Sequence, residues 1–231
     1  MDQEIPLRGG QVTAGIVRVG STVRRPLKAN SPFVHQTLLF LEHHQFAEAP
    51  RFLGIDSKNR EILSFMEGSV LPGTGYRLSD QQLVQVARLI RRFHDLTQQS
   101  DLKGAHEIIM HGDLGPHNTV FQGDQPVGLI DWDDAQPGSR LQDLALAAGA
   151  YIDLGHRTWP VANQARRLQL LCRAYGWPNP AELVDYYEAD LERALLNHQQ
   201  AGRQKAAAIF RRDLRWFAKQ AMALRSHLHD V

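Results

Sequence analysis

The chain has 231 residues, of which 43% are hydrophobic and 22% charged, so a packed core is expected and a disordered chain is not. Its formal net charge is +1, which gives no overall electrostatic reason to expect a nucleic-acid partner. Cys172 is the single cysteine and no secretory or membrane-spanning apolar run is visible, so we expect a cytoplasmic protein with no internal disulfide and no membrane partner.

The first predicted elements are short strands. "VTAGIVRV" and "STVRR" are rich in β-branched residues and are separated by a Gly20-Ser21 turn. A helix is predicted to follow, with Ser31 as its cap and Pro32 at the first helical position. Two further strands, "RFLGID" and "EILSFM", complete a β-β-β-α-β-β pattern over residues 1–66.

The rest of the chain is predicted to be mainly helical. Residues 67–78 are rich in Gly and Pro and are typical of a hinge or linker, and Ser79 with Gln82 forms a capping-box pattern that starts a helix. In residues 79–231 the exception is a short hairpin made by "TVF" and "PVGLID". We therefore expect an α+β fold with a small β-rich N-terminal lobe and a larger helical C-terminal lobe.

The stretch "HGDLGPHNTVFQGDQPVGLIDWDDA", residues 111–135, carries the chemistry. Asp113 and Asn118 lie five positions apart on a loop that contains Gly and Pro, and the hairpin then delivers Asp131 at the end of an apolar strand. A carboxylate beside an amide oxygen offers the hard ligands that Mg²⁺ prefers, which leaves Asp113 to orient or deprotonate a hydroxyl. This division of roles suits phosphoryl transfer.

These motifs resemble those of the aminoglycoside phosphotransferase family, whose kinase-like fold is shared with choline, fructosamine and homoserine kinase relatives. "HGDLGPHN" resembles its H-G-D-x-x-x-x-N motif, "IDWDDA" its metal-binding motif, and "LQDLALA" its downstream D-[LI]-A motif. The resemblance covers most of the chain and is strongest from His111 to Ala145. It implies a protein-kinase-like bilobal fold, with residues 1–66 binding the nucleotide, 67–78 as hinge, and 79–231 holding the catalytic loop and the substrate.

The resemblance also implies a role for individual residues. Asp113 would accept or orient the substrate hydroxyl, and Asn118 and Asp131 would hold Mg²⁺ on the phosphates of ATP, with GTP as an alternative donor. His111 would pack behind the loop and Asp143 would bond to the loop backbone. The remaining nucleotide contacts would be Gly9, Gly10, Arg24 or Arg25, Phe65, Met66 and Glu67.

One position departs from the family pattern. Kinase-like folds place a Lys on the third strand, paired with a Glu of the next helix, whereas this chain has Arg24 and Arg25 on the strand and His35 on the helix. Arg grips phosphate well but is not interchangeable with Lys. The sequence thus predicts an ATP-dependent small-molecule O-phosphotransferase, with a nucleotide-binding module or pseudokinase as the alternative and a metallohydrolase built on His111, Asp113 and His117 as a third hypothesis.

The identity of the phosphate acceptor is left open by the sequence. An aminosugar, choline, a sugar or an amino-acid alcohol would each supply the hydroxyl. The acidic residues that would line a site for a cationic substrate are Asp153, Glu182, Asp185 and Glu188. The same carboxylates are equally compatible with a solvated helix face, and the oligomeric state is not indicated.

Overall fold

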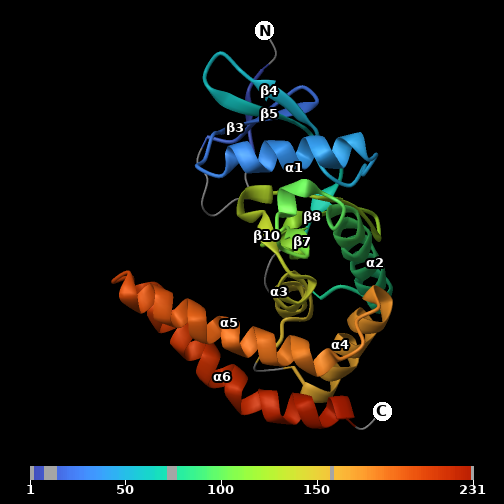
Figure 1. Cartoon of the computed structure of the whole chain (residues 1–231), viewed down its shortest axis with the longest axis vertical. Coiled ribbons are helices and arrows are strands. Elements are labelled where there is room, and N and C mark those ends of the chain that lie inside the picture. The colour runs from blue at the N-terminus through green and yellow to red at the C-terminus, as the bar shows by residue number, and fades with distance from the viewer. Residues whose placement is uncertain (1–2, 8–14, 72–76, 157–158, 230–231) are drawn as a thin grey trace.

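The computed structural model describes residues 3–7, 15–71, 77–156 and 159–229, which form a sheet-rich N-terminal lobe above a helical C-terminal lobe (Figure 1). The strands are β1 (Ile5–Pro6), β2 (Val17–Val19), β3 (Thr22–Pro26), β4 (Phe52–Ile55), β5 (Arg60–Ser64), β6 (Ser69–Val70), β7 (Ile108–Met110), β8 (Thr119–Gln122), β9 (Gln125–Leu129) and β10 (Gln136–Gly138). The helices are α1 (Ser31–His43), α2 (Asp80–Thr97), α3 (Arg140–Ile152), α4 (Val161–Tyr175), α5 (Pro180–Gln200) and α6 (Gln204–His229). Short 3-10 turns are η1 (Asp101–Lys103), η2 (Pro116–Asn118) and η3 (Trp132–Asp134).

The N-terminal lobe is an antiparallel sheet with one helix. Within the described residues five strands pair in the order β1-β2-β3-β5-β4, and α1 lies between this sheet and the helical lobe (Figure 1). The register of β3 and β5 sets Arg25 opposite Glu61. Because side chains alternate across a strand, Arg25 and its neighbour Arg24 point to opposite faces of the sheet.

The start of α1 differs from the prediction. Asn30, not Ser31, is the N-cap residue, and its side chain does not bond to the helix. Instead its Nδ2 donates to the carbonyl oxygens of Asp133 and Ala135, at 2.9 Å each, while Ser31 Oγ accepts from the Lys28 amide at 2.9 Å. The expected cap is absent because the amide of Asn30 bonds across to the C-terminal lobe.

The predicted linker, residues 67–78, contains a strand within its described part. Its strand β6 pairs antiparallel with β8, which forms a hairpin with β9 around the Gly123 turn. The predicted capping box is present, since Ser79 and Gln82 bond reciprocally at the start of α2. Strands β7 and β10, which pair with each other, were not predicted. The lobe boundaries at residues 66 and 78 stay a prediction.

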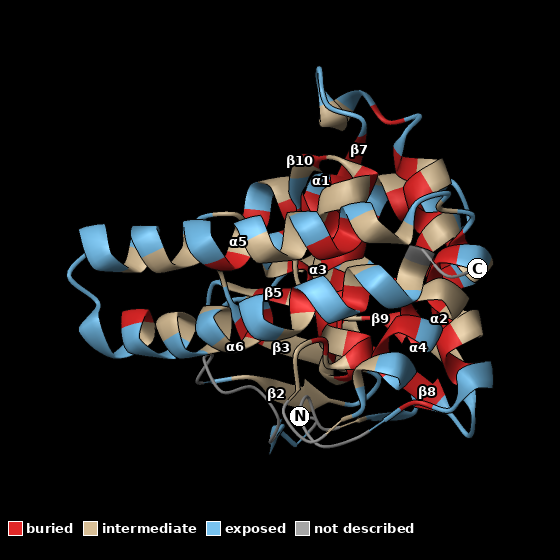
Figure 2. Cartoon of the chain, turned by 90° about the horizontal axis from the view of Figure 1, so that it is seen from below, coloured by how far each residue is buried: buried red, intermediate tan, exposed pale blue. Residues whose placement is uncertain are grey.

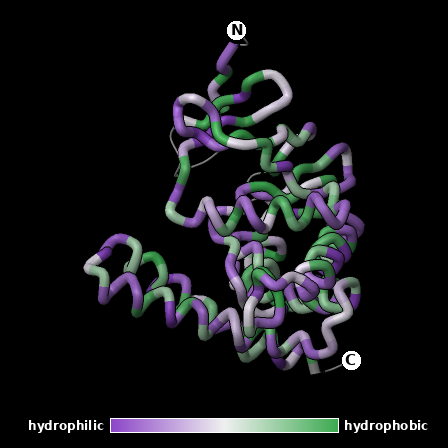
Figure 3. Tube along the Cα trace, turned by 45° about the horizontal axis from the view of Figure 1, so that its top comes forward, coloured by the Kyte–Doolittle hydropathy of each residue, from purple (hydrophilic) through white to green (hydrophobic). Residues whose placement is uncertain are grey.

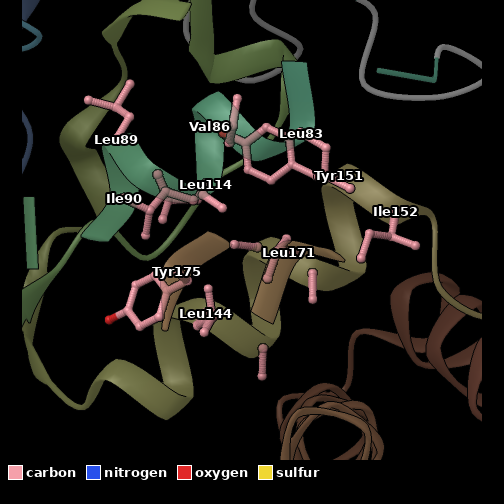
Figure 4. Close-up of a cluster of buried hydrophobic side chains, with 14 of the residues drawn as sticks. Leu83, Val86, Leu89, Ile90, Leu114, Leu144, Tyr151, Ile152, Leu171 and Tyr175 are labelled. Atoms are coloured by element: carbon pink, nitrogen blue, oxygen red, sulfur yellow. The ribbon is translucent and has the colours of Figure 1, made fainter. Parts of the chain in front are cut away.

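The core of the C-terminal lobe joins α2, α3 and α4 (Figure 4). Leu83, Val86 and Ile90 of α2 are fully buried, as the helical spacing in the sequence predicted. They gather with Leu144 of α3 and with Leu114, which comes from the loop that carries Asp113. The loop is therefore anchored in the core directly beside its acidic residue.

Helices α5 and α6 form a long hairpin whose far end extends beyond the rest of the lobe (Figures 1 and 2). The end near residues 196–209 is largely exposed and mixes hydrophilic with hydrophobic residues (Figures 2 and 3). Where the hairpin meets α3, Tyr187 packs edge-on against Phe217 with ring centroids 5.0 Å apart. Among the helices that the structure describes, none is long and apolar enough to cross a membrane.

Candidate phosphoryl-transfer site

The loop between β7 and β8 holds Asp113 and Asn118 against each other. Asn118 Nδ2 donates to the Asp113 carbonyl oxygen at 2.9 Å and to its carboxylate Oδ2 at 2.8 Å. Because both partners accept, the amide nitrogen must face Asp113, and the Asn118 Oδ1 is the atom left for a cation. The five-residue spacing seen in the sequence thus closes into direct contact.

Asp143, at the start of α3, fixes the backbone of this loop. Its carboxylate accepts hydrogen bonds from the amides of His111 and Gly112, at 2.9 and 3.0 Å, and meets His94 Nε2 at 3.0 Å. Burial would raise the pKa of Asp143, but the hydrogen bonds from His94 and from the His111 amide lower it below its ordinary value. Asp143 therefore stays ionised and makes the backbone contact that the family resemblance implies.

Asp143→Asn should lower the free energy of unfolding by about 3 kcal/mol, because an amide cannot accept from both backbone donors and keep the charge that His94 meets. Urea unfolding followed by circular dichroism measures the change. Asp101→Asn is the matched control, since Asp101 is exposed. An equal, small effect of both substitutions would contradict a structural role for Asp143.

His111 packs behind the loop. It is fully buried, its Nε2 bonds to the Ile130 carbonyl at 3.1 Å, and its Nδ1 accepts from the Asp113 amide at 3.4 Å. Burial lowers the pKa of His111, so the ring is neutral with its proton on Nε2. Both ring nitrogens are engaged. The metallohydrolase hypothesis is therefore wrong in its use of His111, and no trio of His, Cys, Asp or Glu converges for a metal in the described ranges.

His117 is the neighbour of Asp113 that the sequence assigned only to that hypothesis. Its Nε2 lies 3.5 Å from Asp113 Oδ2, and a Cβ on Gly115 would lie 2.6 Å from its ring, so a side chain there would displace the ring. Burial would raise the pKa of Asp113, but the contact with His117 and the bond from Asn118 lower it. The same contact raises the pKa of His117. The Asp-x3-His spacing is the signal that identifies this pair.

Gly112 is required by the close approach of another segment. Its φ is +82°, and a Cβ there would lie 2.4 Å from the Asp134 carbonyl oxygen. Gly112→Ala should lower the free energy of unfolding by about 3 kcal/mol, with contributions from backbone strain and from this clash. Gly123→Ala, at φ +58° with open space around it, should lose only the strain contribution of about 1 kcal/mol. Thermal unfolding of the two variants tests the difference, and equal losses would contradict it.

The segment after β9 presents a row of acids to the N-terminal lobe. Asp131 has left-handed φ and ψ of 62° and 65°, and the preceding Ile130 amide bonds to the Asn118 carbonyl at 2.9 Å. Trp132 is buried and donates from Nε1 to the Leu129 carbonyl at 2.8 Å, which anchors the turn. Asp131 is therefore held in a fixed relation to Asn118, with its carboxylate half-exposed.

Arg25 meets these acids from the N-terminal lobe, and Lys28 also pairs with Asp133. Its Nη1 lies 3.0 Å from Asp131 and its Nη2 lies 2.6 Å from Asp133, while its Nε bonds to Glu61 of β5. Burial opposes the charge of Arg25, but the three carboxylates around it raise its pKa above the ordinary value. Arg24 lies on the other face, bonded to Thr22 Oγ1 at 2.6 Å. Of the two Arg candidates, the structure brings Arg25 to Asp131.

The remaining predicted nucleotide contacts lie on the segment after β5, with two exceptions. Phe65 bonds by its amide to the Ser21 carbonyl at 2.8 Å, and Arg18 stacks 3.7 Å above its ring. The Glu67 carboxylate pairs with Arg18 at 2.6 Å, and the side chain of Met66 lies against β9. The exceptions are Gly9 and Gly10, which lie outside the described residues.

The acidic residues suggested for substrate binding have partners in the chain. Asp185 and Glu188 each form an ion pair of 2.7 Å with Arg225 of α6, so they tie the hairpin together. Glu182 Oε1 accepts from the side-chain Nδ2 of Asn179 at 3.2 Å, at the start of α5, and Asp153 ends α3 in a left-handed conformation. Arg225 thus partly neutralises Asp185 and Glu188, as two solvated helix faces of opposite charge would, and a role of these acids in substrate binding stays a prediction.

A sheet-rich lobe with a buried cation, set over a helical lobe that carries Asp113, Asn118 and Asp131, defines a protein-kinase-like fold. Similar solved structures are aminoglycoside 2'-phosphotransferase-IIIa in its GDP complex (TM-score 0.63, 11% identity, 96% of this chain and 94% of that one) and spectinomycin phosphotransferase with ADP and spectinomycin (0.61, 14%, 96% and 92%). A macrolide 2'-phosphotransferase from Brachybacterium faecium is also similar (0.57, 12%, 90% and 91%).

The sequence comparisons identify the family. Residues 98–186 match the model of the phosphotransferase enzyme family. The chain is also 34% identical over 202 residues to the trifolitoxin immunity protein of Rhizobium leguminosarum bv. trifolii, covering 76% of this chain and 75% of the relative. The chain belongs to the phosphotransferase enzyme family, and the kinase-like α+β fold expected from the sequence is confirmed.

Proposed function

We propose that the protein transfers the terminal phosphoryl group of ATP, or alternatively GTP, to a hydroxyl of a small molecule, with Mg²⁺ as cofactor. The observation that carries this proposal is the joint geometry of one loop and one turn. Asp113 contacts Asn118 directly, and Asn118 is bonded through its carbonyl to the amide before Asp131. A buried guanidinium, Arg25, faces Asp131 from the other lobe. Phosphoryl transfer depends on such positioning and charge neutralisation.

The donor set at this site fits Mg²⁺. The side-chain nitrogen of Asn118 donates to Asp113, which leaves its amide oxygen as a metal ligand. Asp131 supplies a half-exposed carboxylate as the second ligand. Two hard oxygen ligands, with the rest of the sphere left to water and phosphate, are what Mg²⁺ takes in nucleotide sites. When bound, the metal would neutralise charge on the phosphates. Asp113 would orient the acceptor hydroxyl and receive its proton at the carboxylate.

The acceptor we propose is a hydroxyl of an antibacterial compound. Two features support this class. The relative at 34% identity is named as an immunity protein against trifolitoxin, and structures with the same fold include proteins named for aminoglycosides, spectinomycin and macrolides. Such a compound would be met inside the cell, which agrees with the cytoplasmic location expected from the sequence.

A second candidate function is nucleotide binding with little transfer, as in a pseudokinase. The observation that favours it is the ion pairing of Arg25 with both Asp131 and Asp133, which engages the proposed metal carboxylate within the protein. Transfer requires that Asp131 is released from Arg25 so that it can hold Mg²⁺. Nucleotide binding with little transfer does not require a metal at Asp131.

Calorimetric titration with ATP and GTP, with and without Mg²⁺, tests the proposal. We expect Mg²⁺-dependent binding of at least one nucleotide and acceptor-dependent nucleotide consumption across a panel of aminoglycosides, macrolides, choline and sugars. Absence of nucleotide binding would sink the proposal. Binding with no turnover for any acceptor, and no difference between the wild-type chain and Asp113→Ala, would favour the second candidate.

A further inference from the structure

Glu61 is a buried acid that the proposed reaction does not yet use. It lies on β5, its side chain is 1% exposed, and it is directly opposite Arg25 in the sheet register. A carboxylate buried this deeply is costly unless it is paired and fully bonded. Both of its oxygens are engaged, Oε1 by Arg25 and Oε2 by His35 at 2.6 Å.

The guanidinium of Arg25 is divided between two sets of acids. Its Nε, near the base of the group, bonds to Glu61 within the N-terminal lobe. Its Nη1 and Nη2, at the tip, span Asp131 and Asp133 across the lobe boundary. One end of a rigid planar group is thus fixed by its own lobe. The other end faces the acids of the proposed metal site, with two donors in a fork.

His35 links this pair to α1. Its ring stacks on Phe52 of β4, with centroids 3.8 Å apart and planes 14° from parallel, and its Nε2 contacts Glu61. The helix therefore contributes an imidazole, and the sheet contributes the acid. The carboxylate that holds Arg25 is placed by the β3–β5 register, and α1 contacts it through His35.

We propose that Glu61 is a positioning residue that clamps the Nε end of Arg25, so that the Nη1 and Nη2 donors are presented to the phosphates of the nucleotide. In the structure the same two donors bridge Asp131 and Asp133, and the nucleotide would take them over while Glu61 keeps its hold. An ammonium group carries its three donors on one nitrogen, so Lys at position 25 could not hold Glu61 by one edge while presenting two parallel donors to the phosphates. This inference rests on the proposed nucleotide-dependent activity.

Glu61→Gln tests the clamp through binding alone. We expect the affinity for MgATP, measured by calorimetry, to fall about tenfold or more, because the fork of Arg25 is no longer oriented. The affinity for adenosine, which has no phosphates, should be unchanged. Asp56→Asn is the matched control, since Asp56 lies 3.8 Å from Arg24 on the opposite face of the sheet, and it should leave both affinities unchanged.

Arg25→Lys provides an independent variant that keeps the charge pair with Glu61. It too should bind MgATP about tenfold or more weakly and adenosine normally. If Glu61→Gln does not fold, the same comparison of MgATP and adenosine affinities is made with Arg25→Lys. Wild-type MgATP affinity in either folded variant, or an equal loss for MgATP and adenosine, would overturn the clamp. Failure of the wild-type chain to bind MgATP would instead refute the proposed function.

Discussion

Asp113→Asn should lower kcat about a thousandfold while leaving the affinity for MgATP within about twofold of the wild-type value. The carboxylate is the group that orients the acceptor hydroxyl and accepts its proton, and an amide can do neither in the same way. Asn118 would lose one acceptor at 2.8 Å but keep the Asp113 carbonyl at 2.9 Å, so the loop should stay folded. Steady-state kinetics with the acceptor found in the panel, together with calorimetry, separates the two effects.

The control for this substitution is Asp124→Asn. Asp124 lies in the turn of the β8–β9 hairpin and accepts from Gln82 at 3.1 Å. Its substitution therefore perturbs the same hairpin without removing a contact of the loop that carries Asp113. The kcat of Asp124→Asn should equal that of the wild-type chain. A similar fall in both variants would mean that the hairpin is merely destabilised. A fall in MgATP affinity of Asp113→Asn equal to its fall in kcat would argue against a role in the chemical step.

The ionisation of Asp113 predicts how activity depends on pH. His117 and Asn118 outweigh burial and lower the pKa of Asp113, so the group stays ionised as the pH falls from neutral. Activity should therefore show no decline from this carboxylate down to about pH 5, and should fall only through its lowered folded-state pKa. A carboxylate with a low pKa is a weak base, which favours orientation of the hydroxyl over early removal of its proton.

Contacts that are local in the chain could be predicted from the sequence. The Asp113–Asn118 contact spans five positions on one loop, and the capping box at Ser79 spans three, so spacing and residue type are enough. Asp143 lies farther along, yet the family motif indicated its bond to the loop backbone, where the structure has it. The loop contact and the capping box follow from short segments of fixed geometry, whereas the Asp143 contact was indicated by the family motif alone.

Contacts that depend on how strands or lobes pack could not be predicted in the same way. The choice between Arg24 and Arg25 depends on which face of β3 is covered, and a shift of one residue in register reverses it. Glu61 was missed because its role depends on the pairing of β5 with β3, and Asn30 because its amide bonds across to Asp133. None of these contacts has a sequence spacing of its own, since each is set by how two strands or two lobes pack.

Arg25→Gln should weaken MgATP binding about a hundredfold, whereas Arg24→Gln should leave it unchanged. The two residues are adjacent and chemically identical, but only Arg25 turns toward Asp131, while Arg24 bonds to Thr22 on the outer face. Loss of the Arg25 charge also leaves Glu61 buried beside an amide, so the free energy of unfolding should fall by about 3 kcal/mol. The MgATP affinities of the two variants are therefore compared at a temperature well below the melting temperature of Arg25→Gln.

The comparison decides which part of the family's phosphate grip survives in this chain. If Arg25 has taken over the role of the usual Lys, its loss should affect MgATP far more than adenosine, and the difference between the two variants should exceed tenfold. If the nucleotide is gripped elsewhere, both variants should bind MgATP alike, and Arg25 would be only a structural tie between Glu61, Asp131 and Asp133. Calorimetry on four samples, two variants with two ligands, is sufficient to distinguish these outcomes.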